Sequence, residues 1–228
     1  MEKSKERIEC VGFIMDGNRR FAKERGLSTL NGHLAGREKF LEVTDWLKEM
    51  KIPHAVFYAF STENWKRSPE EVEYLLMLFR ELLAQIRKEA DERKFNVRVV
   101  GRRDDLPEDI QASIAEVERE TADKYSTTVW VAFSYGGRAE IIEAVNRAVK
   151  VGQEVNEEQF SQLLWTAGMP DPDIIIRTSG EKRLSNFLPW QTVYSEFFFI
   201  DTYWPAFTKT EFTSILEEYA KRERRIGR

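Results

Sequence analysis

Short apolar segments alternate along this chain with longer segments in which apolar residues recur every three or four positions. The short segments predict strands at 9–15, 54–60, 96–100, 128–134, 173–177 and 197–200. Several of these strands are apolar at consecutive positions, as the central strands of a parallel sheet covered by helices are expected to be.

The longer segments predict helices at 32–50, 70–94, 107–124, 137–150, 157–165 and 209–224. The second helix has the clearest start, because Ser68 and Glu71 have the spacing of a capping box and Pro69 occupies the first helical position. Alternating strands and helices indicate an α/β fold with a six-stranded, mostly parallel sheet flanked by helices. No repeat, low-complexity tract or linker divides the chain, so residues 1–228 are expected to form a single domain.

Composition excludes several classes of function. Lys and Arg number 35 against 39 Asp and Glu, and the resulting net charge of −4 argues against general nucleic-acid binding. The single cysteine, Cys10, excludes an internal disulfide and a cysteine-rich zinc site, and two histidines exclude a multi-histidine metal site. No apolar run approaches the ~18 residues of a membrane span, and the first residues lack the apolar region of a signal peptide. A cytoplasmic protein is therefore expected.

Polar segments that contain arginine follow the predicted strands. In open α/β sheets the ligand binds beyond the carboxyl ends of the strands, so these segments are expected to share one edge. Arginines gathered there, in a chain of negative net charge, predict a site for an anion, most naturally phosphate or diphosphate. The segments are 16–20, 60–67, 101–103, 134–138 and 177–186.

The usual nucleotide-binding motifs are missing from the sequence. Neither GxxxxGK[ST] nor GxGxxG occurs, which weakens P-loop and dinucleotide-binding interpretations. Gly17 and Asn18 are instead expected to open a helix whose free N–H groups could hold a phosphate. Asp16 beside them is a natural magnesium ligand, because Mg²⁺ takes one or two carboxylates together with substrate phosphates. Its alternative role is to cap that helix.

Three further features of the sequence have structural interpretations. The acidic run 104–109 precedes a predicted helix, where acids favour the helix dipole, so it is expected to cap the helix rather than to bind metal. His33 and His54 are structural on general grounds. Side chains of the second strand and the following helix either line an apolar cleft beside the polar edge or belong to the core. They are Phe57, Phe60, Trp65, Leu75, Leu78 and Phe79.

Four long motifs occur in order across nearly the whole chain. They are residues 14–20 (IMDGNRR), 58–67 (YAFSTENWKR), 135–138 (YGGR) and 177–187 (RTSGEKRLSNF), and the segments 189–191, 194–196 and 222–227 accompany them. Together they resemble the cis-prenyltransferases, the family of undecaprenyl diphosphate synthase. The resemblance implies a parallel sheet with an apolar substrate tunnel, a homodimer, and Mg²⁺-dependent condensation of isopentenyl diphosphate with an allylic diphosphate.

The resemblance also implies roles by position. Asp16 and Glu196 are the implied metal ligands, with Glu196 reaching the metal across the dimer, and Asp16, Asn18 and Asn64 are the implied catalytic residues. The terminal segment 225–227 resembles a tail that contacts the partner subunit's diphosphate. The implied substrate-binding residues are Gly17, Arg19, Arg20, His33, Phe60, Ser61, Trp65, Arg67, Arg177, Arg183 and Ser185, the last three resembling an isopentenyl diphosphate clamp.

Three positions depart from the family pattern. Cys10 stands where a histidine is usual, Thr29 where an arginine usually grips the allylic diphosphate, and Ala206 where an acid is frequent. The missing arginine leaves open an irregular enzyme that couples two allylic diphosphates. The alternative is that Arg19 or Arg25 supplies the charge instead.

Other classes of function remain as alternatives. A catalytically silent subunit of a heteromeric synthase should have lost the motif residues that this chain keeps, and a diphosphate hydrolase would lack an apolar tunnel. For a synthase, Tyr74 is expected to wall the tunnel and keep the product short to medium in length. A lipid product would also imply peripheral contact with a membrane.

Overall fold

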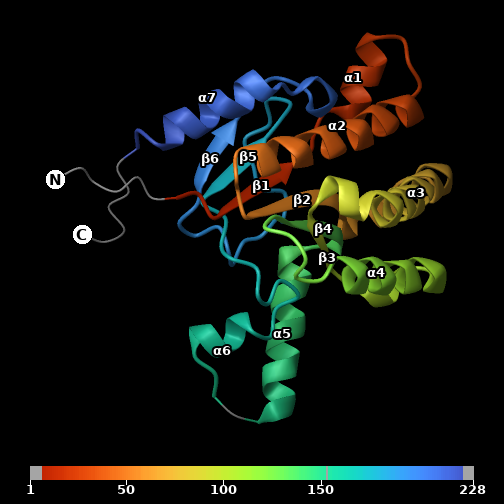
Figure 1. Ribbon diagram of the computed structural model, residues 1–228. Coiled ribbons are helices and arrows are strands. Elements are labelled where there is room, and N and C mark those ends of the chain that lie inside the picture. Colours follow the sequence, from red (N-terminus) through yellow and green to blue (C-terminus); the bar gives the residue numbers. More distant parts are fainter. Residues whose placement is uncertain (1–6, 153, 223–228) are drawn as a thin grey trace.

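Six parallel strands form one sheet at the centre of the computed structural model, which describes residues 7–152 and 154–222 (Figure 1). Their order across the sheet is β3-β4-β2-β1-β5-β6. The strands are β1 (Cys10–Ile14), β2 (His54–Ser61), β3 (Asn96–Val100), β4 (Thr128–Tyr135), β5 (Ile174–Arg177) and β6 (Glu196–Phe199). All six strands expected from the sequence are present, and the parallel sheet is confirmed.

Helices connect the strands in the alternation expected from the sequence. They are α1 (Asn18–Glu24), α2 (Thr29–Glu49), α3 (Pro69–Arg93), α4 (Glu108–Thr121), α5 (Gly137–Val151), α6 (Glu157–Ser161) and α7 (Lys209–Tyr219). Three short 3₁₀ turns accompany them: η1 (Thr62–Lys66), η2 (Arg103–Asp105) and η3 (Trp204–Ala206).

Several boundaries differ from the expected ones. The helix expected at 157–165 ends at Ser161, and the one expected at 107–124 ends at Thr121, whose hydroxyl accepts the Val97 N–H. The expected capping box is half formed, because Ser68 Oγ accepts the Glu71 N–H at 3.3 Å while the Glu71 carboxylate accepts from Arg67 and His33. The last helix ends at Tyr219, and residues 223 and 224 of its expected span lie outside the described residues.

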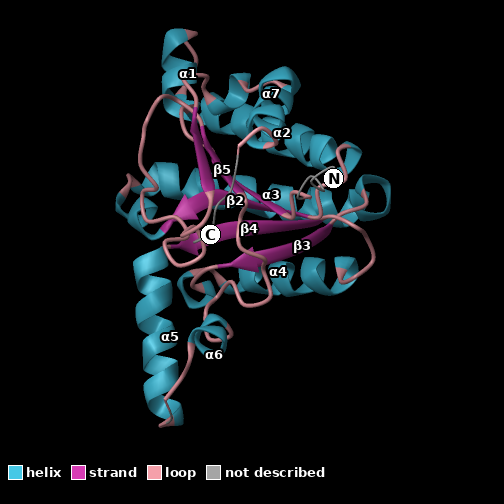
Figure 2. Ribbon diagram, turned by 90° about the vertical axis from the view of Figure 1, so that its left-hand side faces the viewer, coloured by secondary structure: helices cyan, strands magenta, loops and turns pink. Residues whose placement is uncertain are grey.

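The two faces of the sheet are covered differently. Helices α2, α3, α4 and α7 pack on one face and build the larger apolar core. On the other face the smaller core is closed by irregular segments that include Met169, Phe187 and Leu188. Helix α5 extends away from the sheet, with α6 beside it (Figure 2). Glu140 in the first turn of α5 is fully buried, but Ile142 and Val149 farther along this helix are exposed.

The strand register brings the carboxyl ends of the central strands together. Ile14 at the end of β1 is paired with Tyr58 of β2 on one side and with Arg177 of β5 on the other. The segments that follow these strands therefore meet at one edge of the sheet, as the sequence predicted.

Candidate active site

Asp16 and Arg177 face each other at this edge. The Nη2 of Arg177 donates to Asp16 Oδ2 at 2.8 Å, and Thr178 Oγ1 donates to the Asp16 carbonyl at 2.6 Å. Arg177 is only 3% exposed, whereas the Asp16 side chain keeps 30% of its surface accessible. The arrangement is a fixed buried cation behind a carboxylate that still has access to solvent.

Arg177 also organises the segment that follows β5. Its Nη1 donates to the Arg183 carbonyl at 2.6 Å and to Ser185 Oγ at 2.7 Å. Ser185 and Asn186 have φ angles of 51° and 68°, a left-handed conformation that non-glycine residues adopt at a cost of about 1–2 kcal/mol each. The Arg183 side chain pairs with Glu181 and is 58% exposed. The strained segment thus presents an accessible guanidinium beside a buried one.

Gly17 forms the turn between β1 and α1. Its φ of 102° is disfavoured for other residues, and a Cβ there would lie 2.7 Å from the Tyr203 ring. Its N–H donates to Asp16 Oδ1 at 2.7 Å, and no side chain caps the helix. Asp16 therefore does not cap α1, and the alternative role suggested by the sequence is wrong.

Arg20 links α1 to the segment after β5. Its guanidinium donates to the Ser179 hydroxyl and lies 3.5 Å from Glu181 Oε1 and 3.7 Å from Asp16 Oδ2. Arg20 and Arg177 therefore approach the same Asp16 carboxylate from two elements.

A basic hollow of about 490 Å³ lies beside α1. Thr29, the first residue of α2, stands in it where the family pattern has an arginine. Arg25 is directed elsewhere, with its guanidinium 3.9 Å from the centre of the Phe21 ring. The lining residues are Arg19, Arg20, Lys23, Gly26, Leu27 and Thr29. The cations that face Thr29 therefore come from α1.

Residues 61–67 form a turn at the end of β2. The Ser61 N–H donates to Asn64 Oδ1 at 3.1 Å, so the Asn64 side chain holds η1 in place. Trp65 Nε1 donates to Ser134 Oγ at 2.9 Å, and Ser134 Oγ donates to Asp105 Oδ2 at 2.8 Å. Asp105 thus anchors this turn rather than capping α4.

His33 and Arg67 meet at one carboxylate. Glu71 Oε1 lies 3.1 Å from His33 Nε2 and accepts from Arg67 Nη1 at 3.0 Å. Burial lowers the pKa of His33 below 6.5, so the ring is neutral at pH 7 and its Nε2–H donates to Glu71. Burial alone would raise the pKa of Glu71, but the hydrogen bond from His33 and the charge of Arg67 outweigh it and hold that pKa below its usual value. Two expected site residues are therefore joined by Glu71, which the sequence analysis named only as part of a helix cap.

An apolar cavity of about 100 Å³ lies below this edge, between α2, α3 and the sheet. Two of the side chains expected to line such a cavity, Phe57 and Trp65, are absent from its described lining. The Phe57 ring belongs to the core and stacks on the Phe13 ring with centroids 4.8 Å apart. The Trp65 ring packs edge-on against the Phe60 ring with centroids 5.0 Å apart. The lining contains Phe60, Leu75, Leu78 and Phe79, four of the six side chains expected from the sequence. In the described part of the chain, Leu75 lines the cavity and Tyr74 does not, so the wall expected at Tyr74 is displaced by one position.

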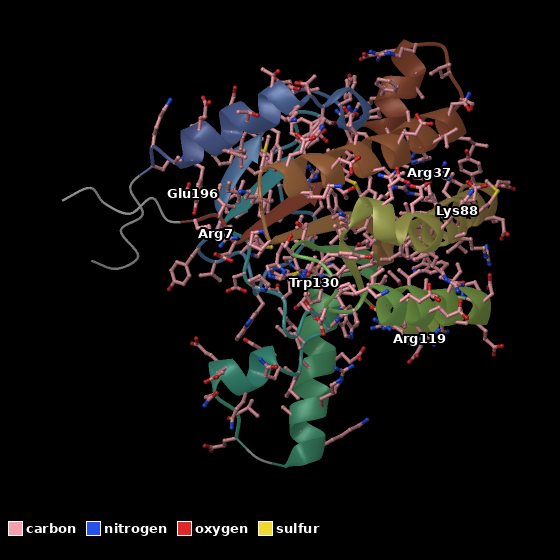
Figure 3. The ribbon with its side chains drawn as sticks, in the orientation of Figure 1. Arg7, Arg37, Lys88, Arg119, Trp130 and Glu196 are labelled. Atoms are coloured by element: carbon pink, nitrogen blue, oxygen red, sulfur yellow. The ribbon has the colours of Figure 1, made fainter. Side chains whose placement is uncertain are left out.

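Glu196 lies at the opposite edge of the sheet from Asp16. It begins β6 and is paired with Ile174, three residues before Arg177. At ~3.3 Å per residue, Ile174 and Arg177 are roughly 10 Å apart along β5, so Glu196 and Asp16 lie at opposite ends of the strands within one chain. Figure 3 shows Glu196 at the end of the molecule where Arg7 lies. The Oε2 of Glu196 accepts a hydrogen bond from Nη1 of Arg222 at 2.5 Å. One chain therefore does not bring the two expected metal ligands together. The tail at 225–227 lies outside the described residues.

Two residues with polar contacts in the site were missed by the sequence analysis. Glu71 follows Arg67 by four positions, and Arg37 follows His33 by four positions on α2. Side chains four apart on a helix share a face, so this spacing could have placed Arg37 beside His33 in the cavity. His54, expected to be structural, accepts from Trp130 Nε1 at 3.4 Å.

Within 7–152 and 154–222, no three His, Cys, Asp or Glu side chains are grouped to hold a metal ion. None of the helices in that part of the chain combines the length and the apolar character needed to cross a membrane.

Known proteins resemble this chain over nearly its whole length. The family model described as "Putative undecaprenyl diphosphate synthase" matches residues 14–227. An isoprenyl transferase of Thermotoga maritima is 46% identical over 222 residues, which cover 95% of each chain. A tritrans,polycis-undecaprenyl-diphosphate synthase (geranylgeranyl-diphosphate specific) of Thermoplasma acidophilum is 43% identical over 229 residues, covering 96% of this chain and 88% of the other.

A solved structure supports the same relationship. Lavandulyl diphosphate synthase from Lavandula x intermedia, in complex with dimethylallyl diphosphate, superposes with a TM-score of 0.91 at 30% identity. The match covers 97% of this chain and 98% of the other. The chain belongs to the undecaprenyl diphosphate synthase family of cis-prenyltransferases, enzymes that join isopentenyl diphosphate to an allylic prenyl diphosphate.

Proposed function

We propose that this prenyl diphosphate synthase is Mg²⁺-dependent, that it binds its two diphosphates on either side of the Asp16–Arg177 pair, and that it works as a homodimer. The observation that carries the proposal is that pair, with its 2.8 Å contact, at the polar edge above the apolar cavity. A diphosphate needs cations and a prenyl chain needs an apolar channel, and the two requirements meet here.

The allylic diphosphate is assigned to the α1 side. Gly17, Asn18, Arg19 and Arg20 follow β1, and the basic hollow beside them adds Lys23. Asn18 also lines the apolar cavity, and its Oδ1 is buried without a hydrogen-bond partner in the described part of the chain. An allylic diphosphate held here would have its prenyl chain directed into the cavity.

Isopentenyl diphosphate is assigned to the segment after β5. Arg177, Arg183 and Ser185 bring two guanidinium groups and a hydroxyl to one strained segment. Guanidinium groups can grip phosphate oxygens through charge-assisted hydrogen bonds, each of which contributes about 1.5–3 kcal/mol. Arg177 is already oriented by three contacts, so little side-chain freedom is lost when substrate binds.

The donor set fits a magnesium ion that is held mainly by substrate. Asp16 offers one carboxylate with accessible surface, and Mg²⁺ commonly takes one or two carboxylates together with phosphate oxygens and water. When bound, the ion would neutralise charge that builds on the leaving diphosphate. Asp16 would hold it, with Glu196 of a second chain as the proposed further carboxylate.

The residues of this chain account for the remaining steps. As the allylic C–O bond breaks, its electron pair leaves with the diphosphate, whose charge Arg19 and Arg20 stabilise. The double bond of isopentenyl diphosphate supplies the pair for the new C–C bond, and a proton passes to a diphosphate oxygen or to water. Asn64, Ser61 and Trp65 hold the turn that closes the site, and His33, Arg67 and Phe60 shape its floor. No side-chain nucleophile is needed.

An exposed apolar surface supports the homodimer. Ile142 and Val149 on α5 are 61% and 72% exposed, and Val193 and Tyr194 before β6 are 69% and 65% exposed. Large apolar side chains exposed on one chain are commonly covered at an interface between proteins. A second copy on this surface would also meet the Glu196 edge. We further propose that the enzyme works in the cytoplasm and meets the membrane through its lipid product.

Irregular coupling of two allylic diphosphates is the second candidate. It is favoured by Thr29, which replaces a cation with a hydroxyl, and by the likeness to a lavandulyl diphosphate synthase. The cations of the basic hollow argue for ordinary elongation, because they already supply charge opposite Thr29.

Incubation with labelled isopentenyl diphosphate, Mg²⁺ and a panel of allylic primers tests the proposal. Chromatography of the lipid products should reveal linear prenyl diphosphates that disappear when EDTA is added and return with excess Mg²⁺. Product formation that persists in EDTA would contradict the metal requirement. Absence of any product from every primer would leave the silent subunit as the better description, and sedimentation of the same sample tests the dimer.

A further inference from the structure

A guanidinium group interrupts the apolar cavity. Around that cavity, the described residues on the α3 and sheet sides are apolar, with Leu78, Phe79 and Val131 among them. Arg37 of α2 stands in the same wall, one turn beyond His33, which is neutral at pH 7. Placing a permanently charged side chain beside an apolar ligand costs free energy unless the charge is paired.

Arg37 is held in that wall by a carboxylate on the neighbouring helix. Its Nη1 donates to Glu81 Oε2 at 2.6 Å, and the Arg37 side chain is 20% exposed against 51% for Glu81. The Nε of Arg37 is buried and has no hydrogen-bond partner among the described residues. The Nη1 end of the guanidinium therefore pairs with the more exposed Glu81 carboxylate. The Nε–H at the inner end is buried with no hydrogen-bond acceptor among the described residues.

The Arg37–Glu81 pair bridges α2 and α3 along the cavity. Both helices begin at the carboxyl edge of the sheet and run back past the cavity, and Glu81 lies between the lining residues Phe79 and Leu82. Figure 3 shows Arg37 between these two helices. The pair thus closes the space between α2 and α3 at a point deeper than His33.

We propose that the Arg37–Glu81 ion pair sets the upper limit on the length of the prenyl chain. The inference rests on the proposed synthase function, in which the chain grows from the polar edge into this cavity. The free volume of about 100 Å³ is small beside the ~300–1,000 Å³ of typical ligand sites, so a longer chain needs the wall to open. A chain that reaches Arg37 must either displace the guanidinium from Glu81 or lie against an uncompensated charge, and both oppose further elongation.

Three variants test the role of the pair by the length of the longest product. Arg37→Ala removes the side chain and should extend the longest product by one or more isoprene units. Arg37→Met keeps an apolar stem of similar length but removes the charge and the pair, and should extend the product to a smaller degree. Glu81→Gln weakens the hold on Arg37 and should also shift the distribution toward longer chains.

Arg80→Ala is the matched control. Arg80 neighbours Glu81 on α3 and pairs with Asp109 of α4 at 2.6 Å, so it forms an interhelical ion pair on the flank away from the cavity. Its loss should leave the products unchanged. If Arg37→Ala and Arg37→Met are active and give the wild-type product lengths, the proposal is wrong. If Arg37→Ala does not fold, the product lengths of Arg37→Met alone test the proposal. A wild-type chain that forms no prenyl product would instead overturn the function on which the proposal rests.

Discussion

Asn186 and Glu63, 123 positions apart in the chain, are joined by a hydrogen bond of 2.9 Å from Asn186 Nδ2 to Glu63 Oε1. The same Asn186 side chain accepts the Arg138 N–H at 2.9 Å through Oδ1, and the Asn186 backbone carbonyl accepts the Gly137 N–H at 2.8 Å. One amide therefore ties the segment after β5 to the turn after β2 and to the start of α5. Asn186 follows Ser185 directly, so the proposed isopentenyl diphosphate clamp depends on it for its position.

Replacing Asn186 with Ala should raise the KM for isopentenyl diphosphate several-fold more than the KM for the allylic primer. The variant loses the two side-chain hydrogen bonds, to Glu63 and from the Arg138 N–H, and keeps only the backbone bond to Gly137. Ala also tolerates the φ of 68° less well than Asn, at about 1–2 kcal/mol. Asn156→Ala is the control, because it removes the cap of α6, costs about 1 kcal/mol of stability and lies away from the site. Steady-state kinetics for each substrate decide the matter, and equal changes in both KM values would contradict the positioning role.

Asp16→Ala should lower turnover on the order of 10²–10³-fold while the circular dichroism spectrum is retained. The variant also leaves Arg177 buried without its carboxylate partner. A fully buried pair loses about 3–5 kcal/mol when broken, and we expect about half of that because the Asp16 side chain is 30% exposed. Urea unfolding measures the stability, and Asp109→Ala, which breaks an exposed pair with Arg80, should change neither quantity appreciably. Near-normal turnover in Asp16→Ala would remove Asp16 from the proposed metal site.

Leu75→Ala should lengthen the products, whereas Tyr74→Ala should leave them unchanged. Leu75 lines the cavity and its truncation enlarges the space near the polar edge, while Tyr74 lies outside the described lining. The two positions are adjacent on one helix and differ only in the face they occupy. Mass spectrometry of the products from one primer makes the comparison. If Tyr74→Ala gives longer products and Leu75→Ala does not, Tyr74 limits the product length, as expected from the sequence.

Stability should fall as the pH is lowered from 7 toward 5. Burial lowers the pKa values of His33 and His54 from 6.5 in the folded chain, so below that pH the unfolded chain binds protons that the folded chain refuses. Well above pH 6.5 both histidines are neutral in both states and contribute nothing to the dependence. Glu63 and Glu71 have pKa values held below 4.5 and lose their contribution only at still lower pH. Urea unfolding of His33→Gln and His54→Gln should show a shallower fall in each variant. An unchanged slope in His33→Gln would mean that its pKa is not lowered.

The sheet and its edge could be predicted because each rests on local pattern. Consecutive apolar residues predict the six strands, and the rule that ligands bind beyond parallel strand ends predicts that Asp16 and Arg177 lie at the same edge of the sheet. The predicted end of the helix at 157–165 was wrong, because the period of apolar residues does not determine where capping and turn contacts end a helix.

Contacts between distant segments could not be predicted from the pattern. The approach of Asn186 to Glu63, and of Arg20 to Ser179, depends on strained backbone after β5 that has no sequence signature beyond its polar composition. The phase of α3 was ambiguous by one residue, which is enough to exchange Tyr74 for Leu75 in the cavity wall. Glu196 illustrates a different limit, because its proposed partner Asp16 would belong to a second chain.

Thr29→Arg should lower the KM for the allylic primer modestly and leave the products linear. Thr29 offers a neutral hydrogen bond where the family pattern has a cation, and charge-assisted bonds are roughly twice as strong. Arg19, Arg20 and Lys23 already line the same hollow, so the new guanidinium would reinforce an existing anion site rather than create one. Arg19→Ala should raise the same KM, since it removes a cation that compensates for Thr29, whereas Arg25→Ala should not, because Arg25 stacks on Phe21. The decisive incubation uses dimethylallyl diphosphate alone, without isopentenyl diphosphate. Branched product from the wild type, suppressed by Thr29→Arg, would show that a loosely held primer admits a second allylic substrate and would establish irregular coupling in place of ordinary elongation.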